Sequence, residues 1–312
     1  RDWLVFEAAS WALAAQRMPA EARRSRWREP LPAVVAADRL RRIPLLRFAS
    51  VGHLLHVAGA GRTVRPEPGR TLVQRGAAAT GVDLVLEGAV SVQDGEAPPI
   101  ERLAPLALGL EAVLGGERQR ESVRAGEGVV CLTIGAGDFL GLLSEEMLLV
   151  RRIFRAILEG GLVEARALPP RRPAAAPEPA GAQILEAVHV LEASPLFARA
   201  TPDQLLQLAR IARAVPLEPG SIFFDEADPA ALYVMASGEA RIETEGAPPV
   251  PARSGDTLGV LESLAGIRGG RARAGVRGSV LQIEAEALLA LLAGDAALLQ
   301  GVFGALFERA RL

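Results

Sequence analysis

Asp83-Leu-Val-Leu-Glu-Gly-Ala-Val-Ser-Val92 and Ala231-Leu-Tyr-Val-Met-Ala-Ser-Gly-Glu-Ala-Arg-Ile242 are corresponding stretches of two similar halves of one chain. The first is short, contains β-branched residues and is bounded by turn formers, which predicts strands of a β barrel or sandwich. The surrounding residues recur in the same order. Pro44 returns as Pro195, Gly88 as Gly238 and Leu132 as Leu281, so the offset drifts only from 151 to 149. The chain therefore contains two copies of one module.

The composition is that of a soluble globular protein with about two domains. The chain has 312 residues, of which 50% are hydrophobic and 23% charged, and this length allows two full cores. A net charge of -2 gives no electrostatic reason to expect a nucleic acid as a partner. One cysteine, Cys131, permits no internal disulfide.

No apolar run reaches the roughly 18 residues that span a bilayer, and the first residues do not resemble a signal peptide. Because the chain lacks an initiator methionine, we interpret it as a fragment whose upstream part is missing. We expect a cytoplasmic location. The alternative is a membrane-bound intact protein of which this chain is the cytosolic part.

Each module is predicted to run from helices through a β core to helices, which gives an α+β fold. We expect a helical segment over 1–31, the first module over 32–165, a linker over 166–181 and the second module over 182–312. Helical periodicity covers 32–58, 138–143 and 147–158 in the first module. In the second module it covers 182–191 and 204–214, with Thr201 as the start signal. Five prolines over 168–180 forbid a continuous helix or strand in the linker.

The repeat resembles the cyclic nucleotide-binding domain family. Ser194-Pro-Leu-Phe, Leu217-Glu-Pro-Gly, the stretch from Ala231 to Ile242, Gly255-Asp-Thr-Leu-Gly and Leu281-Gln-Ile look like the successive signatures of that family. The first module matches more loosely, through Pro66-Glu-Pro-Gly, Leu86-Glu-Gly-Ala-Val-Ser-Val and Cys131-Leu-Thr-Ile. The resemblance implies two β jelly rolls flanked by helices.

The resemblance also implies where a ligand binds. In this family a short segment, the phosphate-binding cassette, presents helix amides and an arginine to the cyclic phosphate, while a glutamate accepts from the ribose 2′-hydroxyl. The cassette of the second module is residues 258–274. Arg268 lies six residues before Ala274, as the family's arginine does, but Val260 stands where the family places glutamate. Glu262 is the alternative acceptor.

The predicted ligand-binding set of the second module is Gly259, Val260, Leu261, Arg268, Gly269 and Gly270. In the first module Leu110 follows Gly109, and the position six residues before Ala125 is Gln119, between Arg118 and Arg120. In the first module, neither the ribose-binding glutamate nor the phosphate-binding arginine of the family stands at its expected position. We therefore predict that the first copy is structural, unless one of the two flanking arginines reaches inward.

Other motifs give no support for catalysis, a cofactor or a metal. His53 and His56 are three residues apart on a predicted helix, but no Cys or third His completes a metal site. Cys131 in an apolar strand is expected to be a buried, inert thiol. The Gly115-Gly116 and Gly269-Gly270 pairs fit no nucleotide triphosphate or dinucleotide motif. Arg271 and Arg273 share one strand face, where solvation is expected.

These motifs leave three functions open. The first is a regulatory module in which cAMP or cGMP binds the second copy and shifts the C-terminal helix, 295–312. The second is a binding-incompetent scaffold for docking or assembly, favoured by Val260, Leu110 and Gln119. The third is a transcription regulator of the catabolite activator type, disfavoured because no helix-turn-helix follows the sensor.

The residues before the first module resemble the end of a HEAT-like helical array. In bacterial proteins such arrays and cyclic nucleotide-binding domains occur together with a membrane transporter-like portion. The expected partners are thus a cyclic nucleotide and an upstream helical or membrane portion of the same protein. Self-association with a second copy of the chain is left as an open alternative, and a nucleic acid is not expected.

Overall fold

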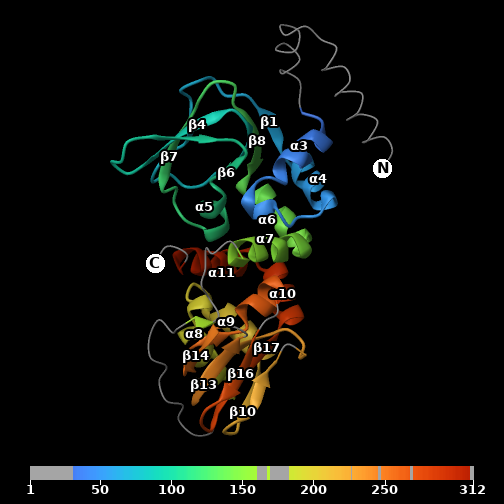
Figure 1. Cartoon of the computed structure of the whole chain (residues 1–312), viewed down its shortest axis with the longest axis vertical. Helices are drawn as coiled ribbons and strands as arrows, with labels where there is room; N and C mark the ends of the chain where they lie inside the picture. Colours follow the sequence, from blue (N-terminus) through green and yellow to red (C-terminus); the bar gives the residue numbers. More distant parts are fainter. Residues whose placement is uncertain are drawn as a thin grey trace. The chain divides into compact units, whose positions relative to one another are not determined.

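A computed structural model describes residues 31–159, 167–168, 183–225, 227–244, 247–267 and 270–309. The predicted HEAT-like segment over 1–31 and most of the predicted linker lie outside these residues. The chain divides into two compact units, Arg1–Arg152 and Ile153–Leu312, which are coloured blue to green and green to red in Figure 1.

The helices of the first unit lie beside its strands (Figure 1). They are α3 (Ala33–Leu40), the 3-10 turn η1 (Pro44–Leu46), α4 (Val51–Ala60), the short α5 (Leu110–Gly115), α6 (Ala136–Glu145) and the first half of α7 (Met147–Glu159). The predicted helices over 138–143 and 147–158 are confirmed. The predicted helix over 32–58 is interrupted, because Pro44 opens the 3-10 turn and Ser50 caps a new helix by accepting from the His53 amide.

The strands of the first unit form two antiparallel four-stranded sheets, in the orders β1-β8-β3-β6 and β2-β7-β4-β5. Their bounds are β1 (Arg62–Val64), β2 (Thr71–Val73), β3 (Gly81–Glu87), β4 (Ala89–Asp94), β5 (Ile100–Leu103), β6 (Leu106–Leu108), β7 (Glu121–Ala125) and β8 (Val130–Gly135). The run predicted over 83–92 is two strands, because Gly88 turns the chain with a φ of +85°. A Cβ at Gly88 would lie 2.8 Å from backbone atoms of Val129.

The interior of the first barrel is made of small aliphatic side chains. Its buried cluster consists of Val73, Val85, Val90, Val92, Leu108, Val123, Ala125, Val129 and Cys131. On the outside, Arg39 Nη1 of α3 pairs with Glu87 Oε1 at the end of β3 at 2.6 Å, and Glu87 is largely buried. This partly buried ion pair holds α3 against the end of β3.

The helices of the second unit repeat this order. They are α8 (Gln183–Ala193), the 3-10 turn η2 (Pro195–Phe197), α9 (Pro202–Ile211), the π-helical turn η3 (Leu261–Ala265), α10 (Ala285–Gly294) and α11 (Ala296–Arg309). The helix predicted over 204–214 is three residues too long, because the chain from Arg213 pairs with β17 instead. In the described part of the chain, no single helix is long and apolar enough to cross a membrane. The pair α10 and α11 passes that test only together, with a bend of 116° between them.

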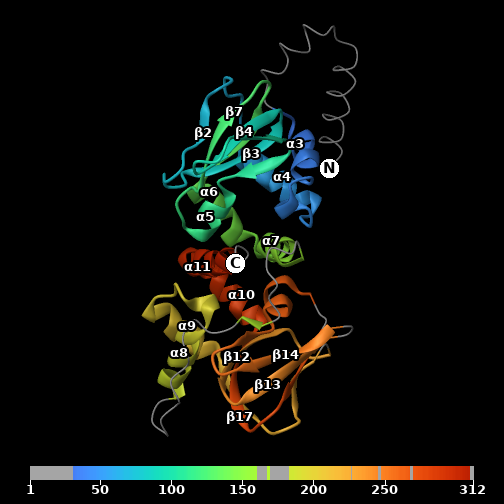
Figure 2. The same cartoon turned by 60° about the vertical axis from the view of Figure 1, so that its left-hand side comes forward.

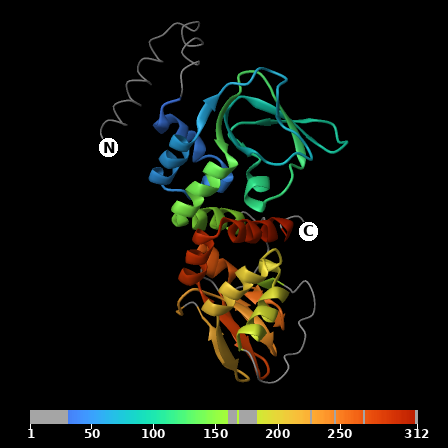
Figure 3. The ribbon, with the colours of Figure 1, turned by 180° about the vertical axis from the view of Figure 1, so that it is seen from behind.

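The strands of the second unit form the sheets β10-β17-β12-β15-β9 and β11-β16-β13-β14. Their bounds are β9 (Ala167–Leu168), β10 (Arg213–Leu217), β11 (Ile222–Phe224), β12 (Ala231–Ser237), β13 (Glu239–Thr244), β14 (Ala247–Arg253), β15 (Thr257–Leu258), β16 (Arg271–Ala274) and β17 (Gly278–Glu284). Helices α8 and α9 lie beside these strands in Figures 2 and 3. Two jelly-roll-like domains with flanking helices confirm the predicted α+β fold.

Strand β9 lies inside the segment that was expected to be a linker. Its two residues pair with β15, which leads into the cassette. Arg271 and Arg273 lie on β16 and both approach Glu243 of β13, at 2.7 and 3.5 Å. The hydrogen bond from Arg271 lowers the pKa of the Glu243 carboxyl, as expected for a solvated charged face.

The start of α9 provides a test of the local signals in the second unit. Thr201 accepts from the Gln204 amide, and the Gln204 side chain accepts from the Thr201 amide, which completes a capping box. Replacing Thr201 by alanine should lower the free energy of unfolding by about 1 kcal/mol, or the melting temperature by roughly 2–4 °C. Thr201→Ser is the matched control, and urea denaturation is the measurement. Equal stability of the two variants would contradict the capping role.

Candidate ligand site

The helical turn of the second module's cassette is preceded by a glycine at which any side chain would be strained. Gly259 follows β15 with a φ of +72°. A Cβ on Gly259 would lie 2.3 Å from the carbonyl oxygen of Ala231 on the neighbouring strand. The chain then enters η3, and the Gly259 carbonyl accepts from the Ser263 amide at 2.9 Å. The position predicted for the start of the cassette is therefore the start of a helical turn.

The structure describes only some of the predicted ligand-binding residues. Val260 is 1% exposed, so the side chain at the family's glutamate position is buried in apolar surroundings. The backbone of Leu261 opens η3, and Gly270 is buried beside the carbonyl of Glu243. Arg268 and Gly269 lie outside the described residues. The phosphate-binding role of Arg268 stays a prediction.

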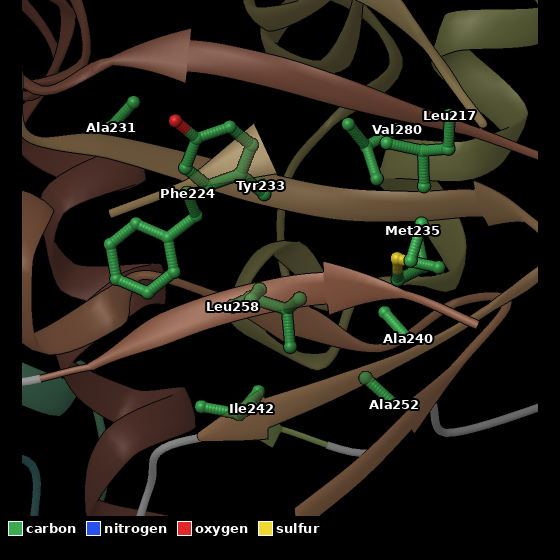
Figure 4. Packing of buried hydrophobic residues seen from close by; sticks show 12 residues of the cluster. Leu217, Phe224, Ala231, Tyr233, Met235, Ala240, Ile242, Ala252, Leu258 and Val280 are labelled. Atoms are coloured by element: carbon green, nitrogen blue, oxygen red, sulfur yellow. The ribbon is translucent and has the colours of Figure 1, made fainter. Parts of the chain in front are cut away.

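Aromatic rings fill the interior of the second barrel next to this cassette. Figure 4 shows Tyr233 and Phe224 beside one another, with Leu258 on a neighbouring strand. The Tyr233 ring centroid is 5.6 Å from that of Phe224 and 5.7 Å from that of Phe223. Its Cδ2 lies 3.4 Å from the place of a Cβ on Gly259. The ring thus packs against the first residue of the cassette.

The Tyr233 hydroxyl is buried but has a partner. Gln282 Nε2 of β17 donates to it at 3.3 Å. Burial, together with the negative charges of Asp228 and Glu262, raises the pKa of Tyr233 despite this hydrogen bond. Tyr233 is neutral at physiological pH and completes the core. Sequence reasoning missed its role, although the chain has a single tyrosine and places it mid-strand.

The cassette of the first module also starts at a left-handed glycine, but its helix is the α-helix α5 and its side chains differ. Gly109 has a φ of +74°, and a Cβ on it would lie 2.8 Å from the carbonyl oxygen of Gly81. Leu110 follows and is buried, so the ribose acceptor is absent here too. Gln119 Nε2 lies 2.9 Å from the place of a Cβ on Gly109. A neutral amide therefore lies against the cassette glycine.

The two arginines beside Gln119 are exposed. Arg118 donates to the Gly76 carbonyl at 2.7 Å, and Arg120 pairs with Glu117 at 2.9 Å. Alternation along an extended segment explains this arrangement, because residues on either side of Gln119 project to the opposite face. Neither arginine has the inward orientation that a bound phosphate would require.

An acidic residue lies on the interior face of the first barrel. Asp83 of β3 is two residues from Val85 of the buried cluster and lies opposite Thr133 of β8. Thr133 Oγ1 donates to Asp83 Oδ1. Burial raises the pKa of the Asp83 carboxyl, while the Thr133 hydrogen bond and the charge of Arg70 oppose this shift. The sequence analysis did not select Asp83 as a site residue. The signal that could have identified it is a charged residue within an otherwise apolar strand.

Cys131 is 1% exposed, and burial together with the charge of Asp83 raises the pKa of its thiol to about 12. It is therefore unreactive, as predicted. His53 Nε2 and His56 Nδ1 lie 3.5 and 2.9 Å from carboxylate oxygens of Glu146. Among the described residues, no group of three or more His, Cys, Asp or Glu side chains is arranged to hold a metal ion.

Two antiparallel jelly-roll-like barrels, each with a glycine-initiated helical turn before the next strand, define the class of cyclic nucleotide-binding folds. Residues 63–146 match the model of the cyclic nucleotide-binding domain family. The sequence of this segment is therefore similar to that of a cyclic nucleotide-binding domain. The match falls on the first module, which the sequence motifs had made the weaker of the two. No curated protein matches the sequence.

Several solved structures are similar to parts of this chain. A cAMP-bound mutant regulatory subunit of a cAMP-independent protein kinase A from Trypanosoma brucei is 13% identical, over 81% of this chain and 84% of that one, with a TM-score of 0.34. The cAMP-bound regulatory domain of Toxoplasma gondii PKA is 16% identical, over 85% and 93%, with a TM-score of 0.35. The N-terminal domain of a transcriptional regulator from Streptomyces coelicolor is 23% identical, over 39% and 92%, with a TM-score of 0.35.

Alanine substitutions at two glycines test the cassette backbone. Gly259 and Gly220 both have a left-handed φ, but a Cβ on Gly220 would meet nothing within 4 Å. Gly220→Ala should therefore lower the free energy of unfolding only by the backbone strain, about 1–2 kcal/mol. Gly259→Ala should lower it clearly more, because the Ala231 carbonyl must also move. Chemical denaturation measures both, and equal losses would contradict the close approach.

The pH dependence of stability tests the environment of Asp83. Its pKa is raised in the folded state, so the folded chain binds more protons than the unfolded chain between the ordinary and the raised pKa. The contribution of Asp83 to the free energy of unfolding therefore falls as the pH rises from the ordinary pKa to the raised pKa. Asp83→Asn should be more stable than the wild type at pH 7, with a gain that disappears below the ordinary aspartate pKa. Thermal melts across pH measure this, and a gain independent of pH would contradict it.

Proposed function

We propose that this chain is a non-enzymatic regulatory module in which ligand binding to a cyclic nucleotide-binding barrel changes the packing of the helices that follow it. The observation that carries the proposal is the cassette backbone, which a left-handed glycine starts in both modules. In the second unit the cassette turn η3 packs against α10, and α10 packs against α11. A ligand that ordered η3 would therefore act on both C-terminal helices.

We propose that the binding site for cAMP or cGMP lies in the second module. Support comes from the register of Arg268, six residues before Ala274, which the first module replaces with Gln119. A guanidinium gives a cyclic phosphate a permanent, forked donor. Because Val260 stands where the family places glutamate, the site lacks one charged hydrogen bond to the ribose. The binding free energy should therefore be less favourable by about 1.5–3 kcal/mol.

A scaffold without a cyclic nucleotide is the second candidate. It is favoured by the buried Val260 and by the Tyr233 ring against Gly259, which fill the second barrel with the chain's own side chains. In this alternative the barrels serve docking or assembly. The proposals of a cytoplasmic location, an upstream helical or membrane portion and self-association rest on the sequence resemblance alone.

Isothermal titration of the full chain with cAMP and with cGMP separates the two candidates. Sensing predicts heat that Arg268→Glu abolishes and that Arg213→Glu preserves, because Arg213 is an exposed arginine on β10 of the same unit. Absence of heat at millimolar ligand would overturn sensing and leave the scaffold. Heat that survives Arg268→Glu would overturn the assignment to the second module.

A further inference from the structure

An acidic residue stands at the break between the two helices that follow each barrel. Glu146 donates its amide to the Leu142 carbonyl at the end of α6, and its own carbonyl accepts from the Val150 amide of α7 at 3.2 Å. Asp295 stands at the equivalent break between α10 and α11, where its carbonyl accepts from the Leu299 amide at 3.0 Å. Each acidic residue therefore joins the end of one helix to the start of the next.

In both modules the third residue of an earlier helix contacts this carboxylate. His53 of α4 places Nε2 3.5 Å from Glu146 Oε2, and Gln204 of α9 donates from Nε2 to Asp295 Oδ2 at 2.7 Å. The offsets of 151 and 149 residues that relate the modules make these pairs equivalent. In the first module His56 adds a second imidazole, with Nδ1 2.9 Å from Glu146 Oε1. We call these three residues of the first module the histidine clasp.

The two imidazoles of the histidine clasp differ in how readily they can take up a proton. The His53 side chain is 12% exposed, and its Nδ1 is buried without a hydrogen-bond partner among the described residues. A proton added there would bury an unpaired donor, which costs free energy. His56 is 67% exposed, so its ring is open to water. His56 is therefore the group that changes charge, and neutral His53 takes the place of Gln204.

The charged groups around α4 act in the same direction as Glu146. No other carboxylate of the described residues lies within 4 Å of an imidazole nitrogen of the clasp. The helices packed against α4 are α3 and α6. Their charged residues are Asp38, Arg39, Asp138 and Glu145. Asp38 and Arg39 are each engaged in an ion pair of their own. The two residues of α6 are acidic, so they too favour a positive charge on α4. The charged residues of α7 begin at Arg151, more than one helical turn beyond Glu146.

We propose that the histidine clasp is a proton-sensitive contact that holds the break between α6 and α7 more tightly at acidic than at alkaline pH. Histidine ordinarily changes its charge between about pH 5 and 8, whereas the amide of Gln204 carries no charge in this range. A protonated His56 makes its hydrogen bond to Glu146 charge-assisted, and loss of the proton leaves a weaker contact. Because α7 begins at this break, the opening of its first turn depends on pH. The inference requires no ligand and is independent of the proposed function.

Hydrogen exchange of two equivalent amides in the full chain, measured by NMR, tests this proposal. Val150 reports the first break and Leu299 the second, which has no histidine. The protection factor of Val150 relative to that of Leu299 should fall about 3-fold between about pH 5.5 and pH 8, the size expected for a partly exposed ion pair. The comparison uses the wild-type chain, so it does not depend on any variant folding. A ratio that is the same at both pH values would overturn the proposal.

Four variants identify the groups responsible. His56→Gln and Glu146→Gln should each abolish the pH dependence of this ratio, and the double variant should show no further change. His53→Gln should retain it, because Gln204 shows that an amide serves at this position. His189→Gln is the matched control, since His189 is an exposed histidine of α8 that lies 3.8 Å from Glu192, and it should also retain the dependence. Persistence of the full pH dependence in His56→Gln, or its loss in His189→Gln, would contradict the assignment to the clasp.

Discussion

The close approach of each cassette glycine to the carbonyl of a neighbouring strand is the constraint on which both modules depend. At Gly109 and Gly259 the backbone is left-handed, and the oxygens of Gly81 and Ala231 occupy the space that a Cβ would need. Each approach fixes the start of the cassette against the first residue of β3 or β12. Because strands alternate their faces, this fixes which side chains enter the barrel beside it.

Within that shared frame the two barrels have diverged in chemistry. The second has completed its interior with aromatic rings and a neutral hydroxyl that Gln282 satisfies, which is the arrangement expected of a stable core. The first retains a carboxyl group whose pKa burial raises, at a position where an apolar residue would pack without that penalty. Residues that reduce stability in this way concentrate at functional sites.

Much of this fold could be predicted from the sequence, and the misses have physical causes. The repeat and the helix over 147–158 depend on local periodicity, which the sequence displays directly. The end of α9 at Ile211 depends on pairing between β10 and β17, a partner 60 or more residues away that periodicity does not reveal. Tyr233 and Asp83 were missed for the same reason. Alternation predicts which face a residue shares, but only the register shows that Asp83 meets Thr133 and Tyr233 meets Gln282.

The route from cassette to helices depends on rigid apolar contact in the second unit. Turn η3 contacts α10 and α10 contacts α11, where Phe303 stacks on Phe307 and on Phe154 of α7, with centroids 6.1 and 4.3 Å apart. Close-packed aromatic contacts have few alternative arrangements, so a displaced α11 must repack or separate as a whole. A ligand that changed η3 would therefore produce a discrete change at α11 rather than a graded one.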